Sequence, residues 1–164
     1  MIMAQAFPKA QVHGFDFHEQ SIEAAKQHAQ QHKLSNLEFY SAEAKELPGK
    51  YDLVTMFDCL HDMGDPVSAL KTIRGALKPG GSVMIVEPMA GDQVQDNLNP
   101  VGRMYYSAST MVCVPTSLAQ ETGKALGAQA GEKRLKKLIT EEAGFSVCRR
   151  ATETPFNLIL EARP

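Results

Sequence analysis

The run Tyr51-Asp52-Leu53-Val54-Thr55-Met56-Phe57 is short, apolar and β-favouring, and it ends at the polar cluster Asp58-Cys59-Leu60-His61-Asp62. Asp65-Pro66 then offers an N-cap acceptor and a proline for the first helical position. Apolar residues recur at helical spacing up to the turn Lys78-Pro79-Gly80-Gly81, and residues 82–86 are a second apolar run. This order predicts a right-handed βαβ unit within a parallel sheet.

The remaining sequence extends this unit in both directions. We expect strands over 11–15, 37–40, 145–151 and 156–162, and helices over 19–34, 102–112, 115–125 and 134–143. The short connection between the last two strands makes that pair antiparallel. The predicted fold is therefore a Rossmann-like, doubly wound α/β domain over 1–164, with a mostly parallel sheet, an antiparallel final strand and a helical cap inserted over 89–130.

The composition of the chain indicates which classes of binding partner are expected. The chain has 164 residues, is 43% hydrophobic and carries a formal net charge of −2, so one core is expected and no basic field suggests nucleic acid or an anionic membrane. No apolar run has spanning length and the N-terminus does not resemble a signal peptide, which favours a soluble cytoplasmic protein. The cysteines Cys59, Cys113 and Cys148 show no metal-ligand or disulfide spacing, which favours reduced thiols.

Polar residues follow each predicted strand. Asp16, Glu43, Asp58 with His61, and Glu87 all stand at strand ends. In open α/β sheets ligands bind outside the carboxyl ends of the strands, so these side chains are expected to share one crevice. A small-molecule site is the simplest expectation there.

Several motifs, in this order, resemble the class I S-adenosylmethionine-dependent methyltransferases. They are Val12-His13-Gly14-Phe15-Asp16, Ala42-Glu43-Ala44, Tyr51-Asp52-Leu53-Val54, Leu77-Lys78-Pro79-Gly80-Gly81 and the final strand pair. The segment Cys59-Leu60-His61-Asp62-Met63-Gly64-Asp65 further resembles the small-molecule O-methyltransferases, in which a His-Asp pair follows the fourth strand. The resemblance implies S-adenosylmethionine as the methyl donor and a small-molecule acceptor, with oxygen favoured.

The resemblance also implies that particular residues contact particular parts of the cofactor. Asp16 would accept hydrogen bonds from the ribose hydroxyls, Phe17 would pack on the adenine, Glu43 and Ala44 would lie at the adenine amino group, and Phe57, Asp58 and Cys59 would border the methionyl and sulfonium end. Capping of the following helix is the alternative role for Asp16.

His61 is the candidate general base, and Asp62 is the residue expected to orient it. An ordinary loop histidine is the alternative. The candidate acceptor contacts are Met63, Met89, Met104, Tyr105 and Tyr106, which would line an apolar pocket under the cap or, equally, pack within helices. The oxygen atoms of Asp58, Glu87, Asp96 and Asn97 could bind magnesium, but a solvated loop explains these residues as well, and no metal site is predicted.

One expected family feature is missing from this sequence. No GxGxG-like loop occurs, and the strand that precedes it in the family has no counterpart, so we expect an N-terminally truncated sheet with unpaired strand edges. Two other functions therefore stay open. One is a non-catalytic module that self-associates, as a homodimer for example, or binds a partner. The other is an NAD-dependent oxidoreductase, although it too needs a glycine fingerprint.

Overall fold

The computed structural model describes the backbone of all 164 residues and every side chain except that of Lys45. The chain divides into two compact units, Met1–Pro48 and Gly49–Pro164, and each is described by itself. No helix among the described residues is long and apolar enough to cross a membrane.

The first unit packs three helical segments beside a two-stranded sheet. Its elements are α1 (Ile2–Ala6), β1 (Val12–Asp16), α2 (Glu19–Gln31), β2 (Leu37–Ser41) and a 3-10 turn (Ala44–Glu46). The strands β1 and β2 are parallel, with Val12 opposite Leu37 and Asp16 opposite Ser41. Small residues at the centre, Ala4 and Ala29, let α1 and α2 approach the sheet closely.

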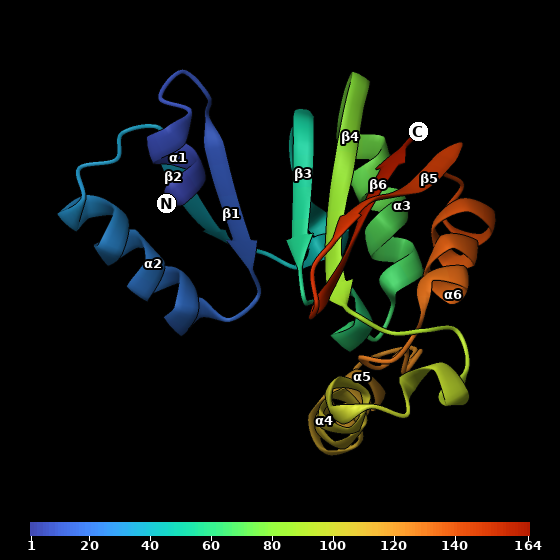
Figure 1. Ribbon diagram of the computed structural model, residues 1–164. Helices are drawn as coiled ribbons and strands as arrows, with labels where there is room; N and C mark the ends of the chain where they lie inside the picture. Colours follow the sequence, from blue (N-terminus) through green and yellow to red (C-terminus); the bar gives the residue numbers. More distant parts are fainter. The chain divides into compact units, whose positions relative to one another are not determined.

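The second unit contains a four-stranded sheet in the order β3-β4-β6-β5 (Figure 1). Its strands are β3 (Tyr51–Phe57), β4 (Leu77–Pro88), β5 (Val147–Glu153) and β6 (Asn157–Arg163). The pair β3 and β4 is parallel, while β6 is antiparallel to both β4 and β5. The predicted βαβ unit and the antiparallel final pair are both confirmed.

The prediction of one mostly parallel sheet is only partly right. The strands β1 and β2 form their own sheet, and two of the three pairings in the other sheet are antiparallel. Among the described residues no strand is hydrogen-bonded to both sheets, so the predicted single ladder is divided into two. The chain nevertheless has a mixed α/β fold.

Helix α3 (Pro66–Ala76) links β3 to β4, as the sequence predicts. Asp65 caps it by accepting a hydrogen bond from the Ser68 amide at 3.0 Å. Its inward residues Leu70 and Ile73 are buried. The helix α6 (Glu132–Lys137), continued by a π-helical turn (Leu138–Glu142), lies next to α3 (Figure 1). Gly144 ends it with a φ of +81°, which confirms the predicted left-handed terminator.

The cap differs from the two helices that the sequence predicts. After a 3-10 turn (Val94–Asn97), α4 (Pro100–Ala108), a π-helical turn (Ser109–Cys113) and α5 (Val114–Leu118) follow without interruption. The predicted start at Pro115 lies one residue inside α5, but no break separates α5 from α4, and α5 ends at Leu118, so the predicted end at 125 is wrong. Proline has no N–H to donate, and the π-helical turn that changes the backbone pairing comes just before it.

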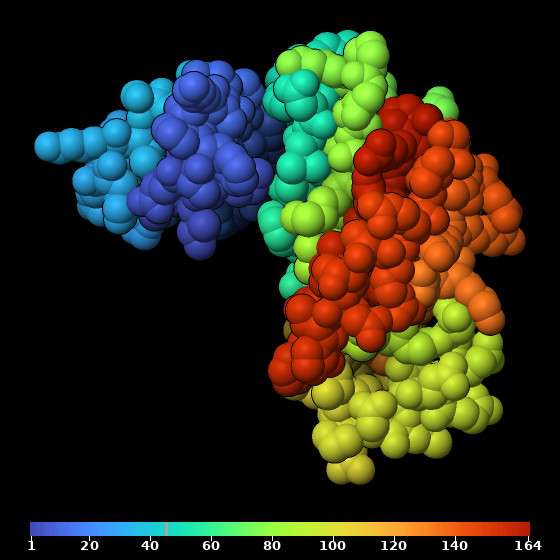
Figure 2. Space-filling view, turned by 45° about the horizontal axis from the view of Figure 1, so that its top comes forward, coloured from blue at the N-terminus to red at the C-terminus, as the bar shows by residue number. Residues whose placement is uncertain are grey.

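The cap lies beyond the carboxyl ends of β3 and β4 (Figure 1). In the space-filling view its residues, in yellow, form a lobe below the red C-terminal hairpin (Figure 2). The Tyr105 hydroxyl in α4 ties the cap to that hairpin by donating to the Phe156 carbonyl oxygen at 2.9 Å. The cap is thus held at the end of the sheet where polar residues follow the strands.

Candidate active site around His61

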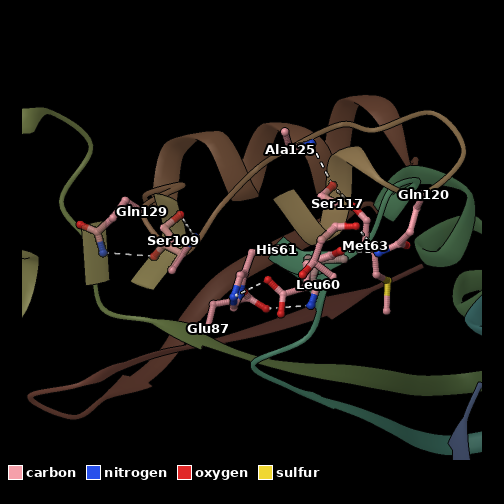
Figure 3. Close-up of polar contacts among 12 residues, drawn as sticks. Leu60, His61, Met63, Glu87, Ser109, Ser117, Gln120, Ala125 and Gln129 are labelled. Atoms are coloured by element: carbon pink, nitrogen blue, oxygen red, sulfur yellow. Dashed lines mark hydrogen bonds and ion pairs between the residues drawn. The ribbon is translucent and has the colours of Figure 1, made fainter. Parts of the chain in front are cut away.

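His61 and Glu87 form a buried pair at the carboxyl ends of β3 and β4 (Figure 3). Glu87 is 1% exposed, and its Oε2 lies 2.6 Å from His61 Nδ1. Its Oε1 accepts the Leu60 backbone N–H at 3.0 Å. A buried carboxylate that accepts at both oxygens holds the imidazole with its proton on Nδ1. The lone pair of Nε2 is then available for other chemistry.

Asp62 and Cys113 face the other side of the His61 ring. Asp62 Oδ1 lies 3.2 Å from His61 Nε2, and within the described part of the chain this buried oxygen has no hydrogen-bond partner. Cys113, in the π-helical turn of the cap, brings its sulfur within 4.8 Å of both neighbours. The sequence predicted that Asp62 orients His61, whereas the structure gives the Nδ1 contact to Glu87.

Burial and neighbouring charge shift the titration of this cluster. Burial alone lowers the pKa of His61, but the hydrogen bond and charge of Glu87, followed by the charge of Asp62, raise that pKa overall. Burial raises the pKa of Glu87 against the opposing effect of His61. Burial together with Asp62 raises the pKa of the Cys113 thiol to about 11, so this thiol is protonated at neutral pH.

Side chains from the end of the cap hold the backbone next to His61 (Figure 3). Ser117 Oγ donates to the Met63 carbonyl at 2.8 Å. Gln120 donates to the Asp62 carbonyl at 2.9 Å and accepts the Gly64 N–H at 2.8 Å. The cap therefore fixes the course of residues 62–64. Sequence reasoning missed Ser117 and Gln120, whose contacts are 54 to 58 residues away and leave no local pattern.

The proposed acceptor contacts have mixed surroundings. Met63 and Met89 are half-buried, whereas Met104 and Tyr106 are exposed. The Tyr105 hydroxyl is occupied by the Phe156 carbonyl, which supports the packing alternative for that side chain. Contact of these residues with an acceptor stays a prediction.

The residues that follow β3 include a strained position. Asp58 has a φ of +46°, in the left-handed region that a non-glycine residue seldom adopts, and its N–H donates to the Val86 carbonyl at 2.8 Å. The chain thereby turns sharply out of the sheet. The Phe57 side chain is 56% exposed, and Cys59 is half-buried with its pKa raised to about 12 by burial and by Glu87.

The predicted nucleoside contacts lie in the first unit. Asp16 Oδ1 accepts the His18 N–H at 2.8 Å, so Asp16 does stabilise the entry to α2 and keeps a second oxygen for a ligand. Phe17 is 73% exposed. The Ala42 N–H donates to the Asp16 carbonyl at 3.0 Å, which brings the segment with Glu43 (exposed) and Ala44 (half-buried) to the same end of the small sheet.

Asp96 and Asn97, two of the four residues considered for magnesium, stabilise the loop before α4. Asn97 is buried, accepts the Gly91 N–H at 2.8 Å and donates to the carbonyls of Gly91 and Gln93. Asp96 accepts the Gln93 N–H at 3.0 Å. Asn97 and one carboxylate oxygen of Asp96 therefore stabilise a capped turn.

A family profile described as a methyltransferase domain matches residues 1–144. Curated relatives include a ubiquinone biosynthesis O-methyltransferase from Acinetobacter baylyi, 33% identical over 88 residues, and a demethylmenaquinone methyltransferase from Lactococcus lactis, 37% identical over 83 residues. These alignments cover 50% and 49% of this chain and 37% and 33% of the relatives. The matched part is thus about a third of each relative.

Solved structures have the same fold. An O-methyltransferase family protein from Burkholderia thailandensis gives a TM-score of 0.69 at 18% identity, covering 98% of this chain and 46% of that one. Human N-acetylserotonin methyltransferase, solved with S-adenosylmethionine, gives 0.68 at 21% identity, covering 98% and 42%. Together with the profile over residues 1–144, these matches show that the chain belongs to the class I S-adenosylmethionine-dependent methyltransferase family.

Proposed function

We propose that this chain transfers the methyl group of S-adenosylmethionine to an oxygen of a small-molecule acceptor, with His61 as the proton acceptor. The observation that carries the proposal is the 2.6 Å contact between His61 Nδ1 and the buried Glu87, which holds the ring by Nδ1 so that Nε2, in the neutral imidazole, is the proton acceptor. The resemblance to a ubiquinone biosynthesis O-methyltransferase supports oxygen as the acceptor atom. Family membership replaces the oxidoreductase alternative.

The exposed residues at the strand ends suit this cofactor. The second carboxylate oxygen of Asp16 is able to accept from ribose hydroxyls, and the exposed ring of Phe17 offers a face to a purine. S-adenosylmethionine supplies a methyl group on a positively charged sulfur, which a nucleophilic oxygen displaces.

Residues of the second unit then accept the proton of the acceptor hydroxyl. As the acceptor oxygen attacks the methyl carbon, its O–H bond breaks and His61 Nε2 takes the proton. Glu87 stabilises the resulting imidazolium, because its carboxylate remains hydrogen-bonded to Nδ1. His61 is 4% exposed, so an acceptor reaches Nε2 only when the cap moves, and reclosure of the cap excludes water.

Binding and turnover test the proposal separately. Calorimetry with S-adenosylmethionine and S-adenosylhomocysteine should show binding that Asp16→Ala weakens. Methyl transfer to a panel of phenols and quinols, followed by mass spectrometry, should fall in His61→Gln by about 10²- to 10⁴-fold. His28→Gln, on the exposed face of α2, is the matched control and should keep the parent rate. Full turnover by His61→Gln would refute the role of His61.

A second candidate function is a non-catalytic module that binds another chain through β3. This strand is at the edge of the four-stranded sheet, and its Leu53 and Phe57 are 45% and 56% exposed. Sedimentation of the reduced chain would show concentration-dependent association, which Leu53→Lys should weaken. Association without any binding of S-adenosylmethionine would favour this function over methyl transfer.

A further inference from the structure

The side chains of His61, Asp62 and Cys113 present three different ligand atoms to one small volume. Their nitrogen, oxygen and sulfur atoms all lie within 4.8 Å of one another, the one such group within the part of the chain that the structure describes. Zinc binds this mixture of donors, whereas magnesium and calcium select oxygen. We propose that these three residues form a binding site for a zinc ion, a site that the sequence did not predict.

The separation of the first two ligand atoms fits a shared ion. Two atoms that each lie about 2.0–2.1 Å from a tetrahedral zinc ion are about 3.3 Å apart. His61 Nε2 and Asp62 Oδ1 are 3.2 Å apart, a contact that is an ion pair when His61 is protonated and that places two ligand atoms side by side when His61 is neutral. When His61 is neutral, this buried oxygen has no hydrogen-bond donor among the described residues, which is costly, and a cation between the two atoms would satisfy it.

Glu87 accepts the outer hydrogen bond that zinc-binding histidines commonly donate. A metal-binding imidazole usually donates its other N–H to a carboxylate, which fixes the ring and its tautomer. Glu87 accepts from His61 Nδ1 at 2.6 Å and is itself held by the Leu60 N–H. The nitrogen that remains, Nε2, is the one that faces Asp62 and Cys113.

The site has an entry route and an open position. The Asp62 side chain is 35% exposed, while His61 and Cys113 are buried, so an ion enters from the Asp62 side. Three protein ligands leave the fourth tetrahedral position for water. Binding replaces the thiol proton of Cys113 by the metal, and that proton is released to solvent.

Metal binding goes beyond the proposed function and is measured without any methyl transfer. It does affect that function, because zinc and an acceptor proton need the same Nε2 lone pair. The zinc-bound chain is therefore expected to bind S-adenosylmethionine but to turn over more slowly. Failure of metal binding would leave the methyl-transfer proposal intact, and the reverse also holds.

Cobalt(II) is a direct probe because it replaces zinc and absorbs light. We expect one equivalent of cobalt, added to the reduced, metal-free full chain, to give tetrahedral visible bands and a near-ultraviolet band from a thiolate ligand. Cys113→Ser should lose the thiolate band. Cys148→Ser, which removes a half-buried thiol on β5, is the matched control and should keep it. Absence of the thiolate band, or its persistence in Cys113→Ser, would overturn the proposal.

Asp62→Asn provides a test that does not depend on a buried cysteine. Urea denaturation of the variant beside the parent shows that it is folded, so that a change in zinc affinity reports the loss of a ligand. Its zinc affinity, measured by competition with a chromogenic chelator, should fall by at least about tenfold. Equal affinity of Asp62→Asn and the parent chain would contradict the assignment of Asp62 as a ligand.

Discussion

Replacement of Glu87 by glutamine is the sharpest test of how His61 is held. In the native chain the two carboxylate oxygens accept from two donors, the Leu60 N–H at 3.0 Å and His61 Nδ1 at 2.6 Å. A glutamine offers one acceptor oxygen and one NH2 group in the same space. If the oxygen stays on Leu60, the amide N–H points at His61 Nδ1, and the imidazole must move its proton to Nε2.

The magnitude follows from burial. A hydrogen bond to a charged group contributes about 1.5–3 kcal/mol, and a buried donor without an acceptor costs about 1–3 kcal/mol. Glu87 is 1% exposed, so water cannot replace either contact. We expect Glu87→Gln to lower the free energy of unfolding by about 2.5–6 kcal/mol if the tautomer is kept, or by about 1 kcal/mol if His61 changes tautomer and the charged hydrogen bond becomes a neutral one.

Two measurements decide between these outcomes. Urea denaturation gives the loss of stability, and ¹⁵N chemical shifts of the imidazole report which ring nitrogen of His61 carries the proton. Glu141→Gln, at an exposed position, is the matched control and should stay within about 0.5 kcal/mol of the parent. A Glu87→Gln chain with parent stability and an unchanged His61 tautomer would refute the orienting role of Glu87.

Three further perturbations test other contacts. Ser117→Ala removes a buried hydroxyl that both donates and accepts, so it should cost about 1–3 kcal/mol in urea denaturation, and a neutral result would contradict the clamp between cap and loop. Asp65→Ala removes the N-cap acceptor of α3 and should cost about 1 kcal/mol, read as a lower thermal midpoint. Hydrogen bonds from Arg150 depress the pKa of Glu132 in the folded state, so the stabilisation is present above the unfolded pKa and is lost as pH falls through the folded one. Glu132→Gln should therefore flatten the acid side of the stability curve, and an unchanged acid dependence would exclude this ion pair as its source.

Local signals explain the parts of the fold that the sequence predicted. Asp65-Pro66 determines the start of α3, Gly144 determines the end of the helix before β5, and the short turn before β6 makes the last pair antiparallel. The continuous helix through Pro115 could not be predicted in this way. A proline in a sequence favours the first position of a helix. Here the π-helical turn Ser109–Cys113 lies just before Pro115, and the helix continues through it.

The site shows the same division between local and distant contacts. The sequence predicts His61 and Glu87 at strand ends, but it favours the neighbouring residue Asp62 as the one that orients the His61 ring. Asp62, one position along the 3-10 turn, lies on the Nε2 side of the His61 ring. The carboxylate that contacts Nδ1 belongs to Glu87, 26 residues away on β4. Cys113 is 52 positions from His61, and only the packing of the cap brings the two together.

Gly64 shows why the cap and the His61 loop act as one structure. A Cβ atom at this position would lie 2.5 Å from the Gln120 Cβ and 2.6 Å from the Glu121 carbonyl oxygen, so a larger residue would push the segment that follows α5 away. That movement would break the contacts from Ser117 and Gln120 to residues 62–64. The position of Asp62 beside Nε2 therefore depends on the cap, whereas the orientation of the imidazole depends on Glu87 in β4. Motion of the cap is therefore expected to change which groups lie next to His61 Nε2, while the hydrogen bond between His61 Nδ1 and Glu87 is kept.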